Sequence, residues 1–311
     1  MYYIGVDLGG TNIAVGIVDE NYNIVGKKSV KTISSRPFEE IVHDMAVCIR
    51  DILTQYDISE DDVASVGIGA PGSLDTENGI MVYANNFKDG TDIHISEMLR
   101  KEFDKPVRIG NDANVAALGE ALAGAAKGHK NCVMITLGTG VGGGIIIDGK
   151  IYEGYRSAGA EIGHIVLIKG GEKCTCGRYG CWEAYASATA LVKQTKAAID
   201  RHPETIMSKS GTVNGRTAFE AARKGDKTGL EVVKNYIEYI GEGLIDIVNV
   251  FRPEIIIIGG GICNEGDYLL KPLKEYVNKY AYGGKLNPEQ EIVAARLGND
   301  AGIIGAAFNG I

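Results

Sequence analysis

The chain has 311 residues, of which 45% are hydrophobic and 23% charged, and its formal net charge is −8 at pH 7. The apolar fraction excludes a mainly disordered chain, and no apolar run approaches the roughly 20 residues of a membrane-spanning helix. The acidity differs from the basic surface that nucleic-acid-binding proteins normally carry. Since the N-terminal residues also lack the basic start of a signal peptide, we expect a cytosolic protein, and its length suggests two lobes.

The first half of the chain predicts strands followed by alternating helices and strands. Three strands separated by turns are expected between residues 3 and 30, as an antiparallel meander. Pro37 and apolar residues at helical spacing then predict a helix at residues 38–56. Beyond it, the pattern predicts a buried strand at 63–69, a helix capped by Ser96 and ending near Phe103, a strand at 107–109 and an alanine-rich helix at 113–126.

The second half continues this alternation around a cysteine-rich stretch. Strands are expected at residues 133–137 and 144–148, and Asp148-Gly149 is a strong signal for a two-residue hairpin. Helices are expected at 187–202, 218–224 and 228–251, and Pro253 ends the last of them. A buried strand at 254–258 and a closing helix at 300–308 follow.

Two segments of the chain resemble each other: Val6-Asp7-Leu8-Gly9-Gly10-Thr11 and Ile135-Thr136-Leu137-Gly138-Thr139-Gly140. In each, a strand leads into a glycine turn, and the apolar strand that follows ends in an aspartate, at Asp19 and Asp148. Internal similarity of this kind predicts two related lobes that each start with a glycine turn.

The first glycine turn, with Gly9, Gly10 and Thr11, has the composition of a phosphate-binding nest. Glycines allow successive N–H groups to converge on an anion, and the Thr11 hydroxyl adds a donor. Asp7, at the end of the preceding strand, could hold Mg²⁺ through water. The alternative is a β-hairpin whose glycines serve the turn geometry alone.

The second glycine turn, with Gly138, Thr139 and Gly140, suits the same role. A G-x-G-x-x-G pattern starts at Gly138, but a strand follows it instead of a helix, which argues against a dinucleotide site, and the chain has no P-loop. A third glycine group is either a tight exit from a strand or a place where the backbone approaches a flat ligand such as adenine; it consists of Gly259, Gly260 and Gly261.

Three of the six cysteines, Cys174, Cys176 and Cys181, lie in one short segment, and His164 precedes them. Three thiolates and one imidazole form the Cys₃His set of a closed tetrahedral Zn²⁺ site. A disulfide is the main alternative, which a reducing cytosol disfavours. A chance cluster of free thiols is the third interpretation.

Four polar residues are candidates for contact with a substrate. Asn111 and Asp112 join a predicted strand to the alanine-rich helix, where the helix dipole favours an ionised carboxylate that could act as a general base. An ordinary N-capping pair is the alternative. Glu161 and Glu183 flank the cysteine segment, so a metal would hold both in place, although most glutamates are simply exposed.

These motifs occur in the same order in the ROK family of sugar kinases and repressors, which the sequence resembles over nearly its whole length. The matching segments are Asp7 to Thr11, Asn111 to Asn114, Leu137 to Gly140, Glu161 to His164 and Cys174 to Glu183. Within the family the chain looks most like a bacterial glucokinase. The resemblance implies ATP-dependent phosphorylation of the 6-hydroxyl of a hexose, with glucose as the first candidate.

The resemblance also implies a fold and an assembly. The expected fold is a two-lobed α/β, actin-like (ribonuclease-H-like) ATPase fold with a ligand cleft between the lobes. The N-terminal lobe would comprise residues 1–116 and be completed by about 298–311, and the C-terminal lobe, residues 117–297, would carry the zinc loop. Members of the family are often dimeric, so we expect a homodimer, with no nucleic-acid or membrane partner.

By this resemblance, Asp112 is the base that removes the proton from the sugar hydroxyl. The other expected sugar contacts are Gly72, Asn85, Asn86, Asn111, Glu161, His164 and Glu183. The expected ATP contacts are Gly9, Gly10, Thr11, Gly138, Thr139, Gly140, Gly259, Gly260 and Gly261, with Mg²⁺ near Asp7. His164 would serve twice, with one ring nitrogen on zinc and the other toward the sugar.

Three alternatives stay open at this point. A sugar-sensing repressor of the family would carry a DNA-binding helical domain ahead of the first glycine turn. We expect no such domain, because the motif of that turn begins at residue 7 and leaves no room for one. A kinase for another hexose, such as N-acetylglucosamine, mannose or fructose, would use the same motif residues. A non-catalytic, zinc-stabilised binding module would have no need of Asp112 and both glycine turns.

Overall fold

The computed structural model describes all residues, 1–311, and they form two compact units. The first unit comprises Met1–Cys132, Gly144–Ala160 and Arg296–Ile311, and the second comprises Val133–Gly143 and Glu161–Ala295. The boundary that we expected at residue 116 lies inside helix α3 (Asp112–Leu122), and all of this helix belongs to the first unit. The reason is packing, because α3 lies against the closing helix α9 (Asp300–Phe308) of the same unit.

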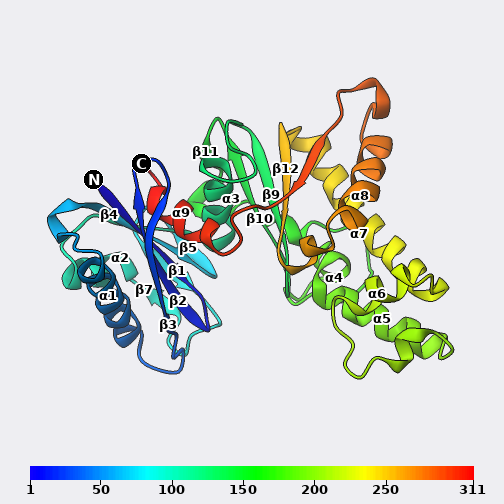
Figure 1. The fold of residues 1–311 in the computed structure, drawn as a ribbon, viewed down its shortest axis with the longest axis horizontal. Coiled ribbons are helices and arrows are strands. Elements are labelled where there is room, and N and C mark those ends of the chain that lie inside the picture. The colour runs from blue at the N-terminus through cyan, green and yellow to red at the C-terminus, as the bar shows by residue number, and fades with distance from the viewer. The chain divides into compact units, whose positions relative to one another are not determined.

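A five-stranded sheet in the order β3-β2-β1-β4-β8 is the centre of the first unit (Figure 1). Its first three strands form the expected antiparallel meander, whereas β1, β4 and β8 are parallel. The parallel strands end at one edge of the sheet, where ligands of α/β proteins commonly bind. The strands are β1 (Tyr2–Leu8), β2 (Asn12–Asp19), β3 (Ile24–Lys31), β4 (Val63–Ala70) and β8 (Val107–Asn111).

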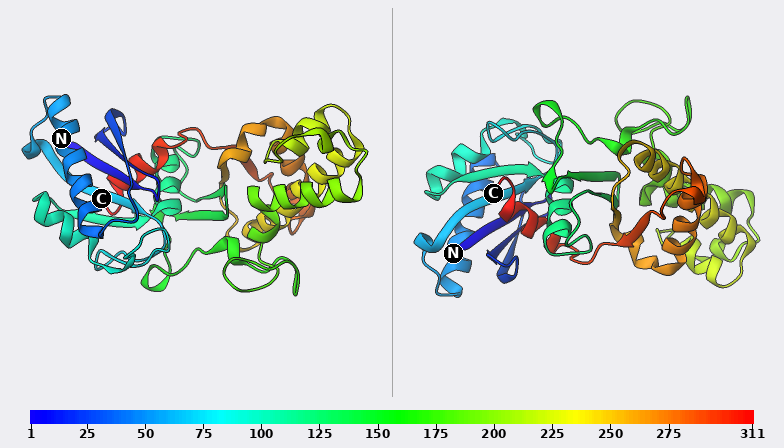
Figure 2. Two further views of the ribbon diagram at one scale, coloured as in Figure 1. Left: turned by 90° about the horizontal axis from the view of Figure 1, so that it is seen from below. Right: turned by 90° about the horizontal axis from the view of Figure 1, so that it is seen from above.

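Helices cover both faces of this sheet. Helix α1 (Phe38–Gln55) packs its apolar stripe against one face, beside α2 (Ile95–Glu102). Helix α9 lies on the other face, and Figure 2 shows it, in red, beside the blue strands from two sides. It can approach so closely because Gly5 and Gly67 face it: a Cβ on Gly5 would lie 1.9 Å from the Ile303 carbonyl oxygen. Side chains alternate between the two faces of a strand. Along β1, glycine therefore faces α9, while isoleucine and valine face the core that α1 covers.

Two features of the first unit differ from the sequence prediction. The expected cap at Ser96 is wrong, because α2 begins one residue earlier, after His94, and the Ser96 hydroxyl is buried without a hydrogen-bond partner. A small antiparallel sheet was also not predicted, since its strands are too short for a clear periodic pattern. It consists of β5 (Ser73–Asp75), β6 (Ile80–Tyr83) and β7 (Thr91–Ile93).

The second five-stranded sheet has the order β11-β10-β9-β12-β13. Counted from its own first strand, this is the same order as in the first sheet, which confirms the internal repeat. The Asp148-Gly149 hairpin is confirmed too, since Ile147 pairs with Lys150 and both turn residues have positive φ. The strands are β9 (Cys132–Leu137), β10 (Val141–Ile147), β11 (Lys150–Ile151), β12 (Ile255–Gly259) and β13 (Glu291–Ala294).

The second unit is rich in helices, and the expected ones are present. The longest, α7 (Lys227–Phe251), is largely buried and ends at Arg252, which has a left-handed backbone just before Pro253. Helix α8 (Asp267–Tyr280) was not predicted, and it contains Pro272, a residue that normally argues against a helix interior. The others are α4 (Glu183–Ala186), α5 (Ala188–Arg201) and α6 (Thr217–Arg223). None of the helices combines the length and apolar character needed to cross a membrane.

Candidate functional site

The first glycine turn joins β1 to β2 and is fixed by its neighbours. The Gly9 amide donates to the Asn12 carbonyl oxygen at 3.0 Å. Thr32, just after β3, holds the turn twice: its hydroxyl donates to the Gly9 carbonyl at 2.7 Å, and its amide donates to the Thr11 carbonyl at 2.9 Å. The turn lines a cavity of about 510 Å³. Other residues of this lining were not predicted from the sequence, because they come from β3 and α9; Lys27, Lys28 and Asp300 are among them.

Two carboxylates gather at the edge where the parallel strands end. Asp7 on β1 pairs with Gly69 of β4, which pairs with Gly110 of β8, and Asp112 follows β8 directly. Burial, and then the negative charge of Asp112, raise the pKa of Asp7 to about 6. The fold thus places the expected magnesium residue and the expected base within electrostatic range of each other.

Asn111 and Asp112 have different structural roles. The Asn111 side chain caps α3, because its oxygen accepts hydrogen bonds from the amides of Ala113 at 3.0 Å and Asn114 at 3.3 Å. This confirms the N-cap interpretation for Asn111 and leaves its amide group as a donor. Asp112 is the first helical residue, where the unpaired N–H groups of the helix start favour the ionised carboxylate.

The loop with Asn85 and Asn86 belongs to the same unit. A Cβ on Gly10 would lie 3.3 Å from the Cβ of Asn86, so this loop lies beside the first glycine turn. Gly72 packs against the backbone just before these asparagines. Its φ is +93°, and a Cβ there would lie 2.2 Å from the Tyr83 carbonyl oxygen. Gly72 therefore shapes the backbone that leads into the asparagines.

The second glycine turn is held by the start of α5. The Gly138 amide donates to the Gly140 carbonyl at 3.0 Å, the Ala188 amide donates to the Gly138 carbonyl at 2.8 Å, and the Thr189 hydroxyl donates to the Thr139 carbonyl at 2.8 Å. The turn lines a cavity of about 460 Å³. Another part of this lining was not predicted from the sequence, and it includes Asn214, Gly215, Arg216 and Glu265. The turn-forming Asn214-Gly215 dipeptide was a signal that could have pointed to it.

The third glycine group divides into two roles. Gly261 lines the cavity together with Gly138 and Thr139. Gly260, with φ of +85°, packs behind the second glycine turn, since a Cβ there would lie 2.3 Å from the Leu137 carbonyl oxygen. Gly259 is buried in β12, where a Cβ would lie 2.7 Å from the methyl carbon of Met134.

The predicted metal ligands come together in the second unit. The ligand atoms of His164, Cys174, Cys176 and Cys181 all lie within 4.8 Å of one another. His164 Nδ1 lies 3.6 Å from Cys174 Sγ, and the Sγ atoms of Cys176 and Cys181 are 3.7 Å apart. Ligands bonded at about 2.3 Å in a tetrahedron are separated by about 3.8 Å, so the geometry fits Zn²⁺.

The loop around these cysteines depends on two glycines. Gly177 and Gly180 have φ of +90° and +83°, and a Cβ on Gly180 would lie 1.7 Å from the Ile168 carbonyl oxygen. All six cysteines are free thiols, so the disulfide alternative is excluded in this structure. Burial and the neighbouring thiols raise the pKa of Cys181 to about 12. A metal would reverse this, because it binds the thiolate form.

Glu183 connects the metal loop to the second glycine turn. One carboxylate oxygen accepts from the Thr175 hydroxyl at 2.8 Å, and the other accepts from the Val141 amide at 3.2 Å. A Cβ on Gly140 would lie 2.3 Å from the second oxygen, so only glycine leaves room for it. Glu161 is exposed, and its carbonyl accepts from the His164 amide at 3.0 Å.

Comparison with known proteins decides the family. The sequence profile of the ROK family matches residues 3–309. The chain belongs to the ROK family. It is 38% identical to a glucokinase of Streptomyces coelicolor, over 98% of this chain and 96% of that protein.

Two solved ROK structures are similar over nearly the whole chain. One is the ROK family glucokinase of Streptomyces griseus in complex with glucose and AMPPNP, with 37% identity, a TM-score of 0.80 and coverage of 99% of this chain and 98% of that one. The other is the ROK hexokinase of Thermus thermophilus, with 32% identity, a TM-score of 0.85 and coverage of 99% and 97%. The expected actin-like ATPase fold is confirmed.

Proposed function

We propose that this ROK protein is a glucokinase that transfers the γ-phosphoryl group of ATP to the 6-hydroxyl of glucose. The observation that carries the proposal is the similarity over almost the full length to ROK glucokinases, one of them bound to glucose and an ATP analogue. The arrangement of the residues supports it, because each unit supplies a glycine turn with its own cavity.

In the proposed mechanism, Asp112 accepts the proton of the 6-hydroxyl as its oxygen attacks phosphorus. Phosphoryl transfer needs mostly positioning and charge stabilisation. Gly9, Gly10 and Thr11 offer donors to the phosphates from the first unit. Gly138, Thr139 and Gly140 do so from the second unit, and Gly261 borders the same cavity, which suits the adenine end of the nucleotide.

The donor set at Asp7 fits Mg²⁺. Its carboxylate is partly buried, and the negative charge of Asp112 acts on it. A hard cation prefers such oxygen ligands, and when bound it would neutralise charge on the ATP phosphates. Asp7 would hold it directly or through water.

In this proposal, zinc has a structural role. His164 Nδ1 faces the sulfurs, so its Nε2 remains for a sugar hydroxyl. Glu161, three residues earlier, is held by the same turn, and Asn85, Asn86 and the Asn111 amide would supply further sugar contacts. We also propose a cytoplasmic homodimer, by analogy with the family.

A coupled assay of ADP release tests the function. Purified protein, with its zinc content measured on the same sample, receives Mg·ATP and glucose, mannose, fructose or N-acetylglucosamine. We expect glucose to give the highest kcat/KM, and about one zinc per chain. A preference for another of the four hexoses would reassign the substrate, and absence of turnover with all of them in zinc-loaded protein would overturn the kinase assignment.

A further inference from the structure

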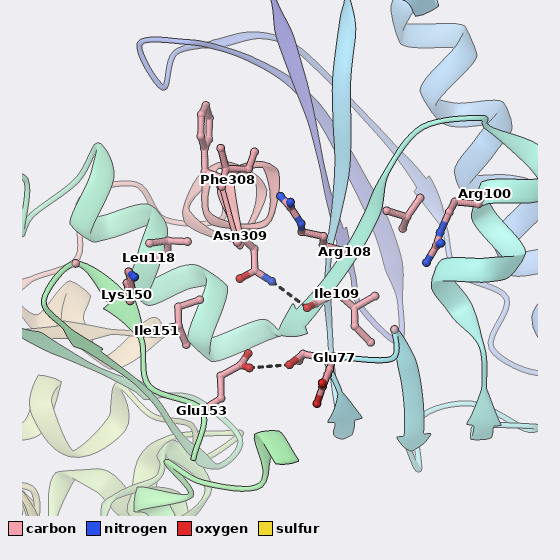
Figure 3. Close-up of a pocket in the computed structure, with 16 residues that line it drawn as sticks. Glu77, Arg100, Arg108, Ile109, Leu118, Lys150, Ile151, Glu153, Phe308 and Asn309 are labelled. Carbon is pink, nitrogen blue, oxygen red and sulfur yellow. Dashed lines mark hydrogen bonds between the residues drawn. The ribbon is translucent and has the colours of Figure 1, made fainter. Parts of the chain in front are cut away.

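The first unit contains a second, larger cavity of about 610 Å³ (Figure 3). It lies between the C-terminal residues after α9, strand β8, helix α3 and the segment at β11. It shares no lining residue with the cavity at the first glycine turn. None of the residues that we assign to the proposed reaction lines this cavity, so the reaction does not account for its charged side chains.

Three cationic side chains line this cavity, and one of them, Arg100, donates from Nε to the Ser96 carbonyl oxygen of its own helix at 3.2 Å. Arg108 on β8 and Lys150 on β11 make no ion pair in the structure, although the chain has a net charge of −8. The stem of Arg108 packs against Gly310, since a Cβ there would lie 3.2 Å from Arg108 Cδ, and this contact helps to position the guanidinium. Arginine and lysine are the side chains that most often bind phosphate groups.

The two glutamate side chains of the cavity, Glu77 and Glu153, lie away from the Arg108 guanidinium (Figure 3). Glu153 is held in place by hydroxyl groups, because one of its oxygens accepts from Thr76 Oγ1 at 2.7 Å and from Ser157 Oγ at 3.3 Å. Glu77 lies beside it in the same lining. Carboxylates repel a phosphate but accept hydrogen bonds from hydroxyl groups, so this part of the cavity favours a polyol.

We propose that this cavity is a second binding site, for a sugar phosphate, which holds the phosphate at Arg108 and Lys150 and sugar hydroxyls at Glu77 and Glu153. Apolar side chains between the two ends, such as Leu118, suit the CH groups of a pyranose ring. The ligand class is that of the product of the proposed kinase reaction, so the regulatory meaning of the site rests on that function. The binding itself does not.

The walls of this cavity belong to the elements that position the proposed base. Arg108 and Ile109 lie on β8, which leads directly to Asp112, and Leu118 lies on α3, which Asp112 starts. The Asn309 side-chain amide donates to the Ile109 carbonyl at 2.9 Å and ties the C-terminal segment to the same strand. A ligand here is therefore coupled to the strand and helix around the base, and we expect it to inhibit turnover without competing with glucose.

Calorimetric titration with glucose 6-phosphate tests the site. Saturating glucose is present throughout, so that the sugar-binding part of the active site is occupied. We expect wild-type protein to bind about one glucose 6-phosphate per chain, and Arg108→Gln/Lys150→Gln to bind it at least tenfold more weakly. The control Arg201→Gln/Lys224→Gln removes the same charge from exposed positions outside the cavity and should bind like wild type.

Three results would overturn the proposal. They are no binding to glucose-saturated wild type, equal binding by the Arg108→Gln/Lys150→Gln variant, and equal affinity for inorganic phosphate, which would remove the sugar from the assignment. Lys150→Gln alone, on an exposed hairpin, repeats the test with little risk to folding. Because calorimetry needs no turnover, failure of the kinase function and failure of this site are distinguishable.

Discussion

The two glycine turns of the molecule share a sequence pattern and a position in their sheets, but they differ in what holds them. The first is held by Thr32 at the end of a neighbouring strand, and the second by Ala188 and Thr189 at the start of a helix. The two turns have the same length, with three residues between the strands, but their hydrogen bonds and supporting contacts differ. In the proposed function, both turns offer N–H groups to the phosphates of ATP.

The side chains around the turns differ more. The position of Asp7 in the first turn is occupied by Thr136 in the second, so only the first unit places a partly buried carboxylate at the end of this strand. The second unit instead places Glu183 against its turn and connects it to the metal loop. One unit thus carries the proposed acid–base and magnesium chemistry, and the other carries the proposed zinc cluster and the sugar contacts proposed beside it.

The largest effect is expected from Asp112→Asn in the first unit. Loss of the proton acceptor should lower kcat by about 10²–10⁴-fold, because phosphate and sugar contacts remain while the base is gone. Glucose affinity, measured by calorimetry, should stay within about threefold. Asp104→Asn removes an exposed carboxylate before β8 and serves as the control. Turnover close to that of wild type in the Asp112 variant would refute the assignment of the base.

Cys181→Ser in the second unit should release zinc and raise the KM for glucose by about tenfold or more. The reason is that the metal orients the His164 ring and the loop that carries Glu183, and such supporting contacts are typically worth this much. Zinc content by elemental analysis and steady-state kinetics measure the two effects. Cys263→Ser, outside the cluster, should keep about one zinc per chain. An unchanged glucose KM in zinc-free protein would contradict the role of the metal loop.

Asp7→Asn should change the pH dependence of stability. The folded protein raises the pKa of Asp7 from 3.8 to about 6, so between these pH values the folded state binds more protons than the unfolded one. Stability therefore falls as pH rises through this range, by about 3 kcal/mol in total for this carboxyl group. Asparagine at position 7 does not ionise, so the Asp7→Asn variant should lack this pH-dependent loss of stability.

Urea unfolding at pH 4 and pH 7.5, without divalent cations, measures the difference between the Asp7→Asn variant and wild type. The variant should lose less stability than wild type over this range, whereas Thr136→Val at the matching position of the second turn should keep the wild-type pH dependence. Equal pH dependence in the wild type and the Asp7 variant would show that burial of this carboxyl does not affect folding.

The parts of the site that the sequence predicted are those determined by short segments. A glycine turn after a strand, an N-cap before an alanine-rich helix, and cysteines spaced in one loop are local patterns, so the turn at Gly9, the cap at Asn111 and the metal cluster could all be inferred. The lysines at the first cavity and Arg216 at the second could not, because separate elements bring them there. The packing of Gly260 against Leu137 could not be predicted either, because these two residues lie on different elements.

The prediction of secondary structure was wrong or incomplete where tertiary contacts override the local preference of the sequence. Ser96 is a good capping residue in isolation, but α2 starts before it, and its hydroxyl faces Gly79, where a Cβ would lie 2.4 Å away. Pro272 should disfavour a helix, yet α8 continues through it and buries Leu269, Leu273 and Val277. Burial of these apolar side chains stabilises α8 despite the lost backbone hydrogen bond.

The smallest effect comes from two alanine substitutions within the second turn. Gly138 has open space around the position of a Cβ, so Gly138→Ala should leave zinc content and thermal stability nearly unchanged. If this glycine exists for close approach of ATP, the variant should still raise the KM for ATP several-fold, because the new methyl group occupies the nucleotide side of the turn. Gly140→Ala must instead displace Glu183, whose oxygen lies 2.3 Å from the added Cβ, and should lower the affinity for glucose as well. Wild-type KM values for ATP in Gly138→Ala would contradict a close approach of ATP at this glycine, and with it a shared role of the two turns in phosphate binding.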